Sequence, residues 1–359
     1  MYVTLSFADL LSFMEAVVAF MLAAMLLASG KVGVRWLAAF SFVLGVSFIQ
    51  AVMPSFNLPV WAGPLMRWLY AMQLLAMPFL YQYAVIATSH AGLLRFYHYV
   101  PAVFAAVVLL PFVGSLLPDT FVVQLIVWLI VLQVVVYLTA IIFMVRSYRI
   151  GLKQTHSTLT GIGFRWLEHL CIWLMALIVF DITIFPLMAH WAVPFETIQF
   201  VFNLISTLYV LWLTRSALEQ HSVSPRGAEK LSPSYEKSGL DVDTAGSLAA
   251  SVVKVMENEE LYLKPDLMLA DMASSSGVSN HILSEVLNKT IGQNFYDFVN
   301  SYRVKAAQKL LGETDRTVLD VAFAVGFNNK VSFNQAFKKQ VSMTPSQYRR
   351  KLGASKLQR

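Results

Sequence analysis

Two short segments near the end of the chain carry polar side chains at helical spacing, and this chemistry suits the reading of base edges in DNA. Asn and Gln can pair bidentately with adenine in the major groove, and a carboxylate can accept a hydrogen bond from cytosine N4. The outward-facing residues are Asn280, His281, Ser284, Glu285 and Asn288 in the first segment and Lys330, Val331, Asn334, Gln335 and Lys338 in the second.

The same region is strongly basic. Residues 330–359 contain eight Lys and Arg and no Asp or Glu. Such cations bind the phosphate backbone and supply affinity without sequence information. A solvated tail or attraction to anionic lipid would give the same composition, but two adjacent base-reading segments favour DNA. The candidate phosphate contacts are Lys338, Lys339, Arg349, Arg350 and Lys351.

A repeat predicts the elements that position these side chains. "DMASSSGV" at 271–278 and "DVAFAVGF" at 320–327 share Asp, Ala and Gly at equal spacing, 49 residues apart. Alanine allows two helices to cross closely, and the glycine is expected in the left-handed conformation that ends a helix. A cap then opens a second helix, Ser279 in one copy and Asn328 or Asn329 in the other. The repeat therefore predicts two helix-turn-helix units.

The second helix of each unit should bury one face. Leu283, Val286 and Leu287 are expected inside in the first unit, and Phe333, Ala336 and Phe337 in the second. Between the units, apolar residues at 295, 298, 299, 302, 306 and 310 predict one long amphipathic helix that joins them. "TVLD" at 317–320 is a capping box at the start of the second unit.

With these motifs in place, the segment 261–350 resembles the DNA-binding domain of the AraC/XylS family. Gly326-Phe327, Phe333, Phe337-Lys338-Lys339, Thr344-Pro345 and Tyr348-Arg349 carry the resemblance to the family's C-terminal signature. The resemblance covers about a quarter of the chain and implies that two recognition helices enter successive major-groove segments of double-stranded DNA. Carried over by position, it implies that the base-reading residues are Asn280, His281, Ser284 and Glu285 in the first helix and Lys330, Val331, Asn334 and Gln335 in the second. Glu285 departs from the family, in which many members carry a basic residue, and it could instead pair with Lys289 one turn later.

The rest of the chain has the composition of a membrane protein. Residues 1–214 hold 8 Lys and Arg and 6 Asp and Glu, whereas residues 215–359 hold 19 and 15. Apolar runs near 8–29, 36–54, 66–88, 98–117, 121–145, 166–189 and 195–214 are each long enough to span a bilayer. The first run lacks a basic n-region and a cleavage site, so it is expected to be a span and not a signal peptide.

The loops predict the orientation of these spans. Lys and Arg gather in the first, third and fifth loops and after the last span, which places those segments in the cytoplasm. Arg67, at the outer edge of the third span, is the exception. We therefore expect a bacterial inner-membrane protein with its N-terminus outside and its C-terminal domain in the cytoplasm.

Ionisable side chains inside the bilayer are costly, by at least about 2.5–3.5 kcal/mol each, and so mark candidate functional positions. Two readings remain open: a sensor site that faces outward, or structural ion pairs and interhelical hydrogen bonds. The candidate sensor residues are Glu15, Arg67, Asp181, Gln199 and Asn203.

Several chemistries are not supported. The single Cys171 allows no internal disulfide and is expected to be a buried apolar residue. No zinc-type spacing, metalloprotease motif or nucleophile elbow is present, and no lysine lies within a span. We therefore expect no catalytic residues, no metal and no cofactor.

The predicted fold is all-α: a seven-helix transmembrane bundle at 1–216, a flexible linker at 217–245, and a domain at 246–359 with two helix-turn-helix units joined by a long helix. The predicted function is that of a membrane-embedded transcription regulator, in which the bundle senses a small or lipid-phase signal. The expected partners are DNA, membrane lipid, a small-molecule ligand or a membrane partner protein, and a second copy in a homodimer. The alternatives are a membrane enzyme or transporter with a regulatory tail, and a factor that proteolysis releases.

Overall fold

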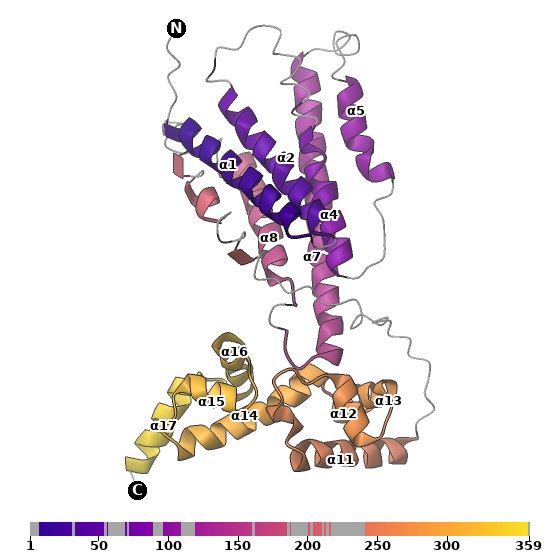
Figure 1. Ribbon diagram of the computed structural model, residues 1–359, viewed down its shortest axis with the longest axis vertical. Coiled ribbons are helices and arrows are strands. Elements are labelled where there is room, and N and C mark those ends of the chain that lie inside the picture. The colour runs from indigo at the N-terminus through magenta and orange to yellow at the C-terminus, as the bar shows by residue number, and fades with distance from the viewer. Residues whose placement is uncertain are drawn as a thin grey trace. The chain divides into compact units, whose positions relative to one another are not determined.

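The computed structural model describes residues 7–30, 33–53, 72–88, 96–108, 119–159, 162–184, 204–209 and 241–357, and a few isolated positions between them (Figure 1). Within this described part the regular structure is helical. Its strand-type pairing is an isolated antiparallel bridge between His156 and Met268. The chain divides into two units, of which unit 1 comprises Met1–Arg146 and Phe164–Pro225, and unit 2 comprises Ser147–Gly163 and Arg226–Arg359.

Unit 1 is built from apolar helices rich in Leu, Ala and Val. Its helices are α1 (Phe7–Ala28), α2 (Val34–Val52), α4 (Ala76–Ala87), α5 (Val100–Val108), the first part of α7 (Asp119–Thr155), α8 (Arg165–Val179) and the π-helix η3 (Phe180–Ile184). Small side chains let α1 and α2 approach closely, since Ala16, Ala19 and Ala23 are buried and Ser41 Oγ donates to the Ala19 carbonyl at 2.8 Å.

Two helices are long and apolar enough to cross a bilayer, at Asp9–Ala28 and Val127–Thr155. Shorter apolar helices occur at Val34–Gln50 and Ala76–Ala87. Length and composition alone are weak evidence, because buried core helices and signal sequences share them. Parts of the other expected spans lie outside the described residues, so the seven-helix bundle stays a prediction.

Unit 2 contains the predicted all-α domain with two halves. The first half holds α11 (Val242–Asn258), η5 (Leu261–Leu263), α12 (Leu269–Ser276), α13 (Asn280–Glu285) and the π-helical turn η6 (Val286–Ile291). The second holds α15 (Val318–Ala324), α16 (Lys330–Val341) and α17 (Pro345–Leu357), and α14 (Phe295–Glu313) runs between them. Each half has its own apolar core, and α14 contributes Phe295, Phe298 and Val299 to the first and Val304, Ala307 and Leu311 to the second.

The turn chemistry of the repeat is as predicted. Gly277 and Gly326 have φ angles of 66° and 91°, and each begins the turn between the two helices of its unit. Ser279 accepts a hydrogen bond from the Ile282 amide, and Asn329 accepts one from the Ser332 amide. Thr317 and Asp320 form the reciprocal capping box. The predicted helix-turn-helix units are therefore present in the fold.

Two boundaries differ from those expected from the sequence. Helix α11 begins at Val242, inside the predicted linker, directly after Asp241 at the N-cap position, and it buries Val252 and Met256 in the first core. The end of α7 and the following loop, Ser147–Gly163, pack with unit 2, although the sequence assigned them to the membrane domain. Residues 217–240 of the predicted linker lie outside the described residues.

Candidate nucleic-acid interface

The first candidate reading helix, α13, is held by its apolar face. Leu283, Val286 and Leu287 are buried as predicted. Asn280 and His281, in the first turn, are exposed, and Ser284 is half-buried. The amino-terminal residues of a recognition helix are those that contact base edges, so α13 presents two of its candidate residues at the appropriate end.

The second candidate reading helix, α16, is organised in the same way. Phe333, Ala336 and Phe337 are buried, and the Phe333 ring lies 5.2 Å from Phe327 and 5.6 Å from Phe337 between centroids. The outer face carries the candidate residues of this helix. Of these, Lys330, Val331 and Gln335 are exposed and Asn334 is half-buried.

Glu285 has two structural contacts that compete with a role in base reading. Its carboxylate accepts a hydrogen bond from Lys289 Nζ at 2.7 Å, one turn along the helix. It also lines a pocket with Val242 and Ala245 of α11. The ion pair is the alternative that the sequence had left open for this residue, while contact with a base stays untested.

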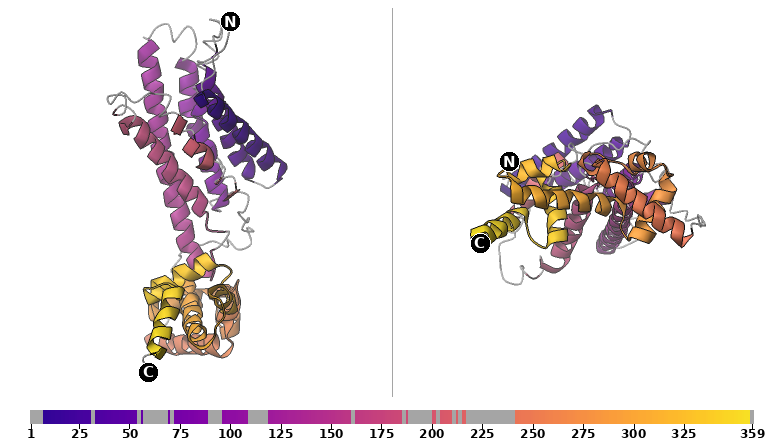
Figure 2. Two further views of the ribbon diagram at one scale, coloured as in Figure 1. Left: turned by 90° about the vertical axis from the view of Figure 1, so that its left-hand side faces the viewer. Right: turned by 90° about the horizontal axis from the view of Figure 1, so that it is seen from below.

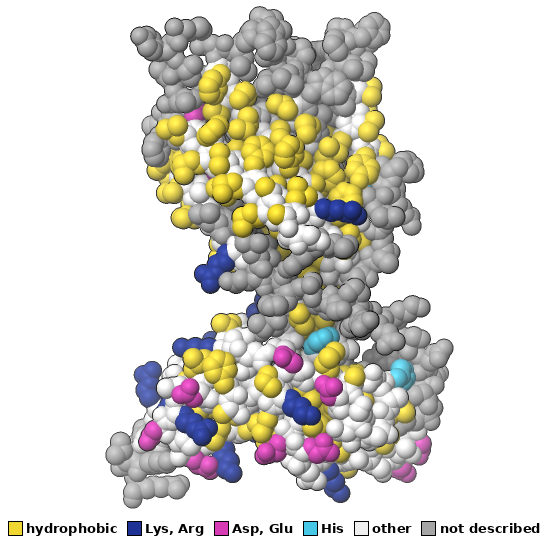
Figure 3. All heavy atoms as spheres, viewed as in Figure 1, with side chains coloured by type: hydrophobic (Ala, Val, Ile, Leu, Met, Phe, Trp, Pro, Cys, Tyr) yellow, Lys and Arg dark blue, Asp and Glu magenta, His cyan; other side chains and the backbone are white. Residues whose placement is uncertain are grey.

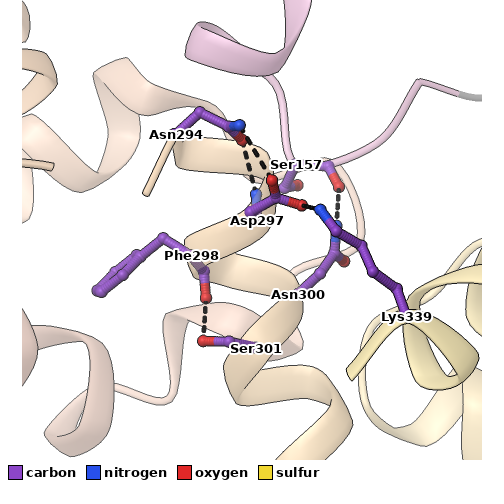
Figure 4. A network of polar contacts seen from close by, with 7 residues as sticks. All are labelled: Ser157, Asn294, Asp297, Phe298, Asn300, Ser301 and Lys339. Carbon is purple, nitrogen blue, oxygen red and sulfur yellow. Dashed lines mark hydrogen bonds and ion pairs between the residues drawn. The ribbon is translucent and has the colours of Figure 1, made fainter. Parts of the chain in front are cut away.

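The candidate phosphate contacts differ in their surroundings. Lys338, Arg350 and Lys351 are exposed. Lys339 Nζ forms an ion pair with Asp297 Oδ1 of α14 at 2.7 Å, and Figure 4 draws this pair. Arg349 is half-buried and donates from Nη2 to the Arg316 carbonyl at 2.6 Å. Lys339 and Arg349 thus link elements of unit 2 in addition to any contact with phosphate.

Unit 2 carries charged side chains of both signs on the face drawn in Figure 3, among many neutral ones. Its charge is therefore not a uniform basic surface. The affinity for a polyanion would come from particular cations beside the two reading helices, and their carboxylate partners would moderate it.

Sequence reasoning missed one functional residue, Arg303 of α14. Its side chain is 1% exposed, and burial lowers the pKa of its guanidinium to about 10. The group stays charged at neutral pH and donates to backbone carbonyls at Tyr262, Lys264 and Pro265. The available signal was its spacing, since Arg303 lies four residues from both Val299 and Ala307 on the buried stripe of this helix.

The candidate sensor site is only partly described. Glu15 of α1 is buried, and its Oε1 accepts a hydrogen bond from Thr207 Oγ1 at 3.0 Å, while its Oε2 has no hydrogen-bond partner among the described residues. Arg67, Gln199 and Asn203 lie outside the described residues, as does the side chain of Asp181. The expected cluster is therefore neither assembled nor excluded.

Among the described residues, no group of three or more His, Cys, Asp or Glu side chains could hold a metal ion. Cys171, the free cysteine of α8, is buried.

Comparison with known proteins places a helix-turn-helix domain in unit 2. Residues 272–351 match the family model described as a helix-turn-helix domain, which is of the AraC type. The match includes both reading helices, α14 and most of the basic segment. These residues are thus an AraC-type helix-turn-helix domain, and this part of the sequence-based prediction is confirmed.

Curated relatives share this part of the chain. An uncharacterized HTH-type transcriptional regulator of Staphylococcus aureus strain COL is 35% identical over 98 residues, which are 27% of this chain and 13% of that protein. The HTH-type transcriptional regulator GlxA of Rhizobium meliloti is 28% identical over 122 residues, which are 34% of this chain and 38% of that protein. The chain thus spans well under half the length of these relatives. No solved structure is significantly similar to it.

Proposed function

We propose that the protein is a membrane-embedded, one-component transcription regulator whose AraC-type domain binds specific sites on double-stranded DNA. The observation that carries the proposal is the pair of reading helices α13 and α16, each capped at its start and each with exposed polar side chains in its first turns. Helix α14 contributes to the cores of both helix-turn-helix units and so joins them. Both reading helices can therefore bind one DNA molecule. The names of the relatives, which are transcriptional regulators, agree with this function.

The membrane assignment is supported by the side chains that the helices of unit 1 bury and expose. On α1, Ser12 and Glu15 are buried, whereas Phe13, Met14 and Met21 are exposed. On α7, Gln133 is buried and donates to the Leu74 carbonyl at 2.9 Å, while Trp128, Leu132 and Phe143 are exposed. Polar groups inside and large apolar groups outside suit helices whose surroundings are lipid.

Hydrophobic side chains cover most of the described face of unit 1 in Figure 3. Exposed apolar surfaces of this extent mark sites of interaction with a membrane or with another protein. A bacterial inner membrane, with the N-terminus outside and the AraC-type domain in the cytoplasm, is the location that the distribution of Lys and Arg favours. In this proposal the bundle responds to a small or lipid-phase signal, or to a membrane partner.

Footprinting with the full-length chain in detergent tests the DNA-binding function. Genomic fragments that the protein enriches would be challenged with nuclease at low salt and again at physiological salt. We expect two protected half-sites on one face of the duplex, and an apparent affinity that falls steeply with salt. Uniform cleavage at every salt concentration would rule the function out.

Two alternatives make different predictions. A membrane enzyme or transporter with a regulatory tail would keep its turnover or flux after deletion of residues 220–359. A regulator that acts by proteolytic release would yield a shorter soluble fragment in stimulated cells. A full-length protein that stays in the membrane fraction while transcription changes would favour the one-component regulator.

A further inference from the structure

A four-residue segment at the end of helix α7 is built into the first helix-turn-helix unit. Helix α7 contributes Asp119–Arg146 to unit 1 and Ser147–Thr155 to unit 2, and Figures 1 and 2 draw it as one uninterrupted helix. Residues 154–157, at its end, make polar contacts with α14, with η6 and with the segment before α12. We name these four residues the clamp segment.

Ser157 makes the most buried of these contacts. Its carbonyl oxygen accepts hydrogen bonds from Arg303 Nη1 at 3.3 Å and from Asn300 Nδ2 at 3.4 Å, and its hydroxyl lies 3.2 Å from Arg303 Nη2. Figure 4 shows the Asn300 side chain pointing from α14 toward Ser157. All three side chains are buried. The buried guanidinium therefore depends on the clamp segment for part of its hydrogen bonding, and an unsatisfied charged donor would be costly.

The backbone extends the contact. The Ser157 amide donates to the Leu267 carbonyl at 3.2 Å, and His156 pairs with Met268 as an antiparallel bridge. Leu267 and Leu269 belong to the core of the first helix-turn-helix unit. The clamp segment thus pairs, like a short strand, with the residues just before α12, the first helix of this helix-turn-helix unit.

Gln154 reaches the π-helical turn η6, which follows directly on the first reading helix α13. Asn288 Nδ2 donates to Gln154 Oε1 at 2.9 Å and to the Ser284 carbonyl at 2.8 Å. Asn288 follows Ser284 by one turn, so this chain of hydrogen bonds runs from α7 to a candidate base-reading residue. The contact is at the carboxyl end of the reading helix, whereas Asn280 and His281 at the other end remain exposed.

We propose that the clamp segment is an intramolecular coupling element that sets the position of the first reading helix, α13, according to the state of helix α7. Its contact with Asn288 lies just beyond the carboxyl end of α13, so it leaves Asn280 and His281 exposed for base contact, while Ser284 shares the same chain of hydrogen bonds. The clamp acts chiefly on the first helix-turn-helix unit, because Leu267, Met268 and Asn288 lie there. Its other partners, Asn300 and Arg303, lie on α14, and the Arg303 guanidinium is also 5.5 Å from the ring centroid of Phe327 in the second helix-turn-helix unit. The coupling rests on the proposed DNA-binding function, whereas the clamp contact does not.

Disulfide trapping in the full-length chain tests the contact independently of DNA. In a Cys171→Ala background, the pair His156→Cys and Met268→Cys should cross-link efficiently in isolated membranes. Residues paired in an antiparallel bridge have Cα atoms about 4.5–5.5 Å apart, within the range for a disulfide. The control pair is His156→Cys with Glu313→Cys, because Glu313 lies about 20 Å along α14 from Asn300. Equal, slow cross-linking of the two pairs would overturn the clamp.

Footprinting tests the coupling with a variant that loses the two side-chain hydrogen bonds of the clamp segment and keeps its backbone hydrogen bonds. Gln154→Ala with Ser157→Ala should weaken protection of the half-site read by α13 about tenfold and leave the half-site read by α16 within twofold. Oxidation of the His156→Cys and Met268→Cys pair in this variant should restore the lost protection. Equal loss at both half-sites, or no loss at either, would overturn the coupling role.

The two tests separate the inference from the function on which it rests. If the wild-type chain protects no DNA while the cysteine pair cross-links, the proposed function fails and the clamp contact stands. If DNA is protected while the cysteine pair fails to cross-link, the clamp fails and the function stands.

Discussion

At the residue scale, the exposed side chains of α16 divide into those that suit base edges and those that suit phosphate. Gln335 and Lys338 are three residues apart on one helix and both are exposed. An amide can discriminate between bases, whereas an ammonium group neutralises phosphate on any sequence. The pair therefore offers a matched test of the two roles.

We expect Gln335→Ala to relax sequence preference and cost about 1–3 kcal/mol on the preferred site, because it removes a base contact. Lys338→Ala should instead weaken binding to every sequence and lower the salt slope by about one. Titration of the full-length variants against the preferred and a scrambled duplex at several salt concentrations distinguishes them. If both variants behave alike, the division of roles is wrong.

His156 gives the clamp segment a dependence on pH. Burial lowers the pKa of its imidazole below the ordinary value of 6.5, so the docked state favours the neutral ring. At a pH between the lowered and the ordinary pKa, the imidazole of His156 takes up a proton when the clamp segment is released. The contribution of the neutral His156 ring to docking is therefore fully present above about pH 6.5 and is lost as the pH falls through the lowered value.

Hydrogen exchange of residues 154–157 in the full-length chain measures this effect. After correction for intrinsic exchange rates, we expect protection of these amides to fall between pH 7.5 and 5.5. His156→Gln keeps a polar side chain that does not titrate in this range, so its protection should stay constant. A parallel fall in both proteins would assign the effect to another group.

At the element scale, the two turns of the repeat are alike in sequence but not in their surroundings. A Cβ atom on Gly277 would have no heavy atom within 4 Å, whereas one on Gly326 would lie 2.5 Å from the Tyr262 carbonyl oxygen and 2.9 Å from that of Leu263. Gly326 thus lies against the backbone of η5, which belongs to the first half of unit 2.

Gly277→Ala should cost about 1–2 kcal/mol, the strain of a left-handed conformation. Gly326→Ala adds an overlap with backbone that cannot move aside, a further cost of about 1–3 kcal/mol. Thermal unfolding of the two variants, followed by circular dichroism, should therefore give a clearly lower Tm for Gly326→Ala. Equal Tm values would mean that the contact with η5 is absent in solution.

The elements that local rules govern were predictable. Caps, left-handed glycines and the periodicity of 295–313 depend on neighbouring residues, and the structure places Ser279, Thr317 and Gly326 as the sequence indicated. The contacts of Ser157 and Arg303 join residues 146 positions apart. No local pattern encodes such a pairing, so the sequence alone predicts that the clamp segment is part of a loop of the membrane domain. The candidate sensor residues stay a prediction for a related reason, because their proximity depends on how separate helices pack.

At the scale of the whole molecule, the proposed function requires the AraC-type domain to reach the chromosome. Fusions at the C-terminus to a reporter active only in the cytoplasm should be active, and fusions to a reporter active only in the periplasm should be silent. The Lys and Arg of the first, third and fifth loops are the physical reason for this orientation. The opposite result would exclude gene control by the anchored protein.

The course of α7 also bears on how such proteins can be recombined. A designer who exchanges the C-terminal domain for that of another regulator would ordinarily cut once, between residues 217 and 245. That single cut keeps Gln154 and Ser157 of the original protein, which would then lie against a domain that lacks their partners. A working hybrid would need three junctions, one in the tether and one on each side of residues 147–163, because the two segments that form unit 2 are not contiguous in the sequence.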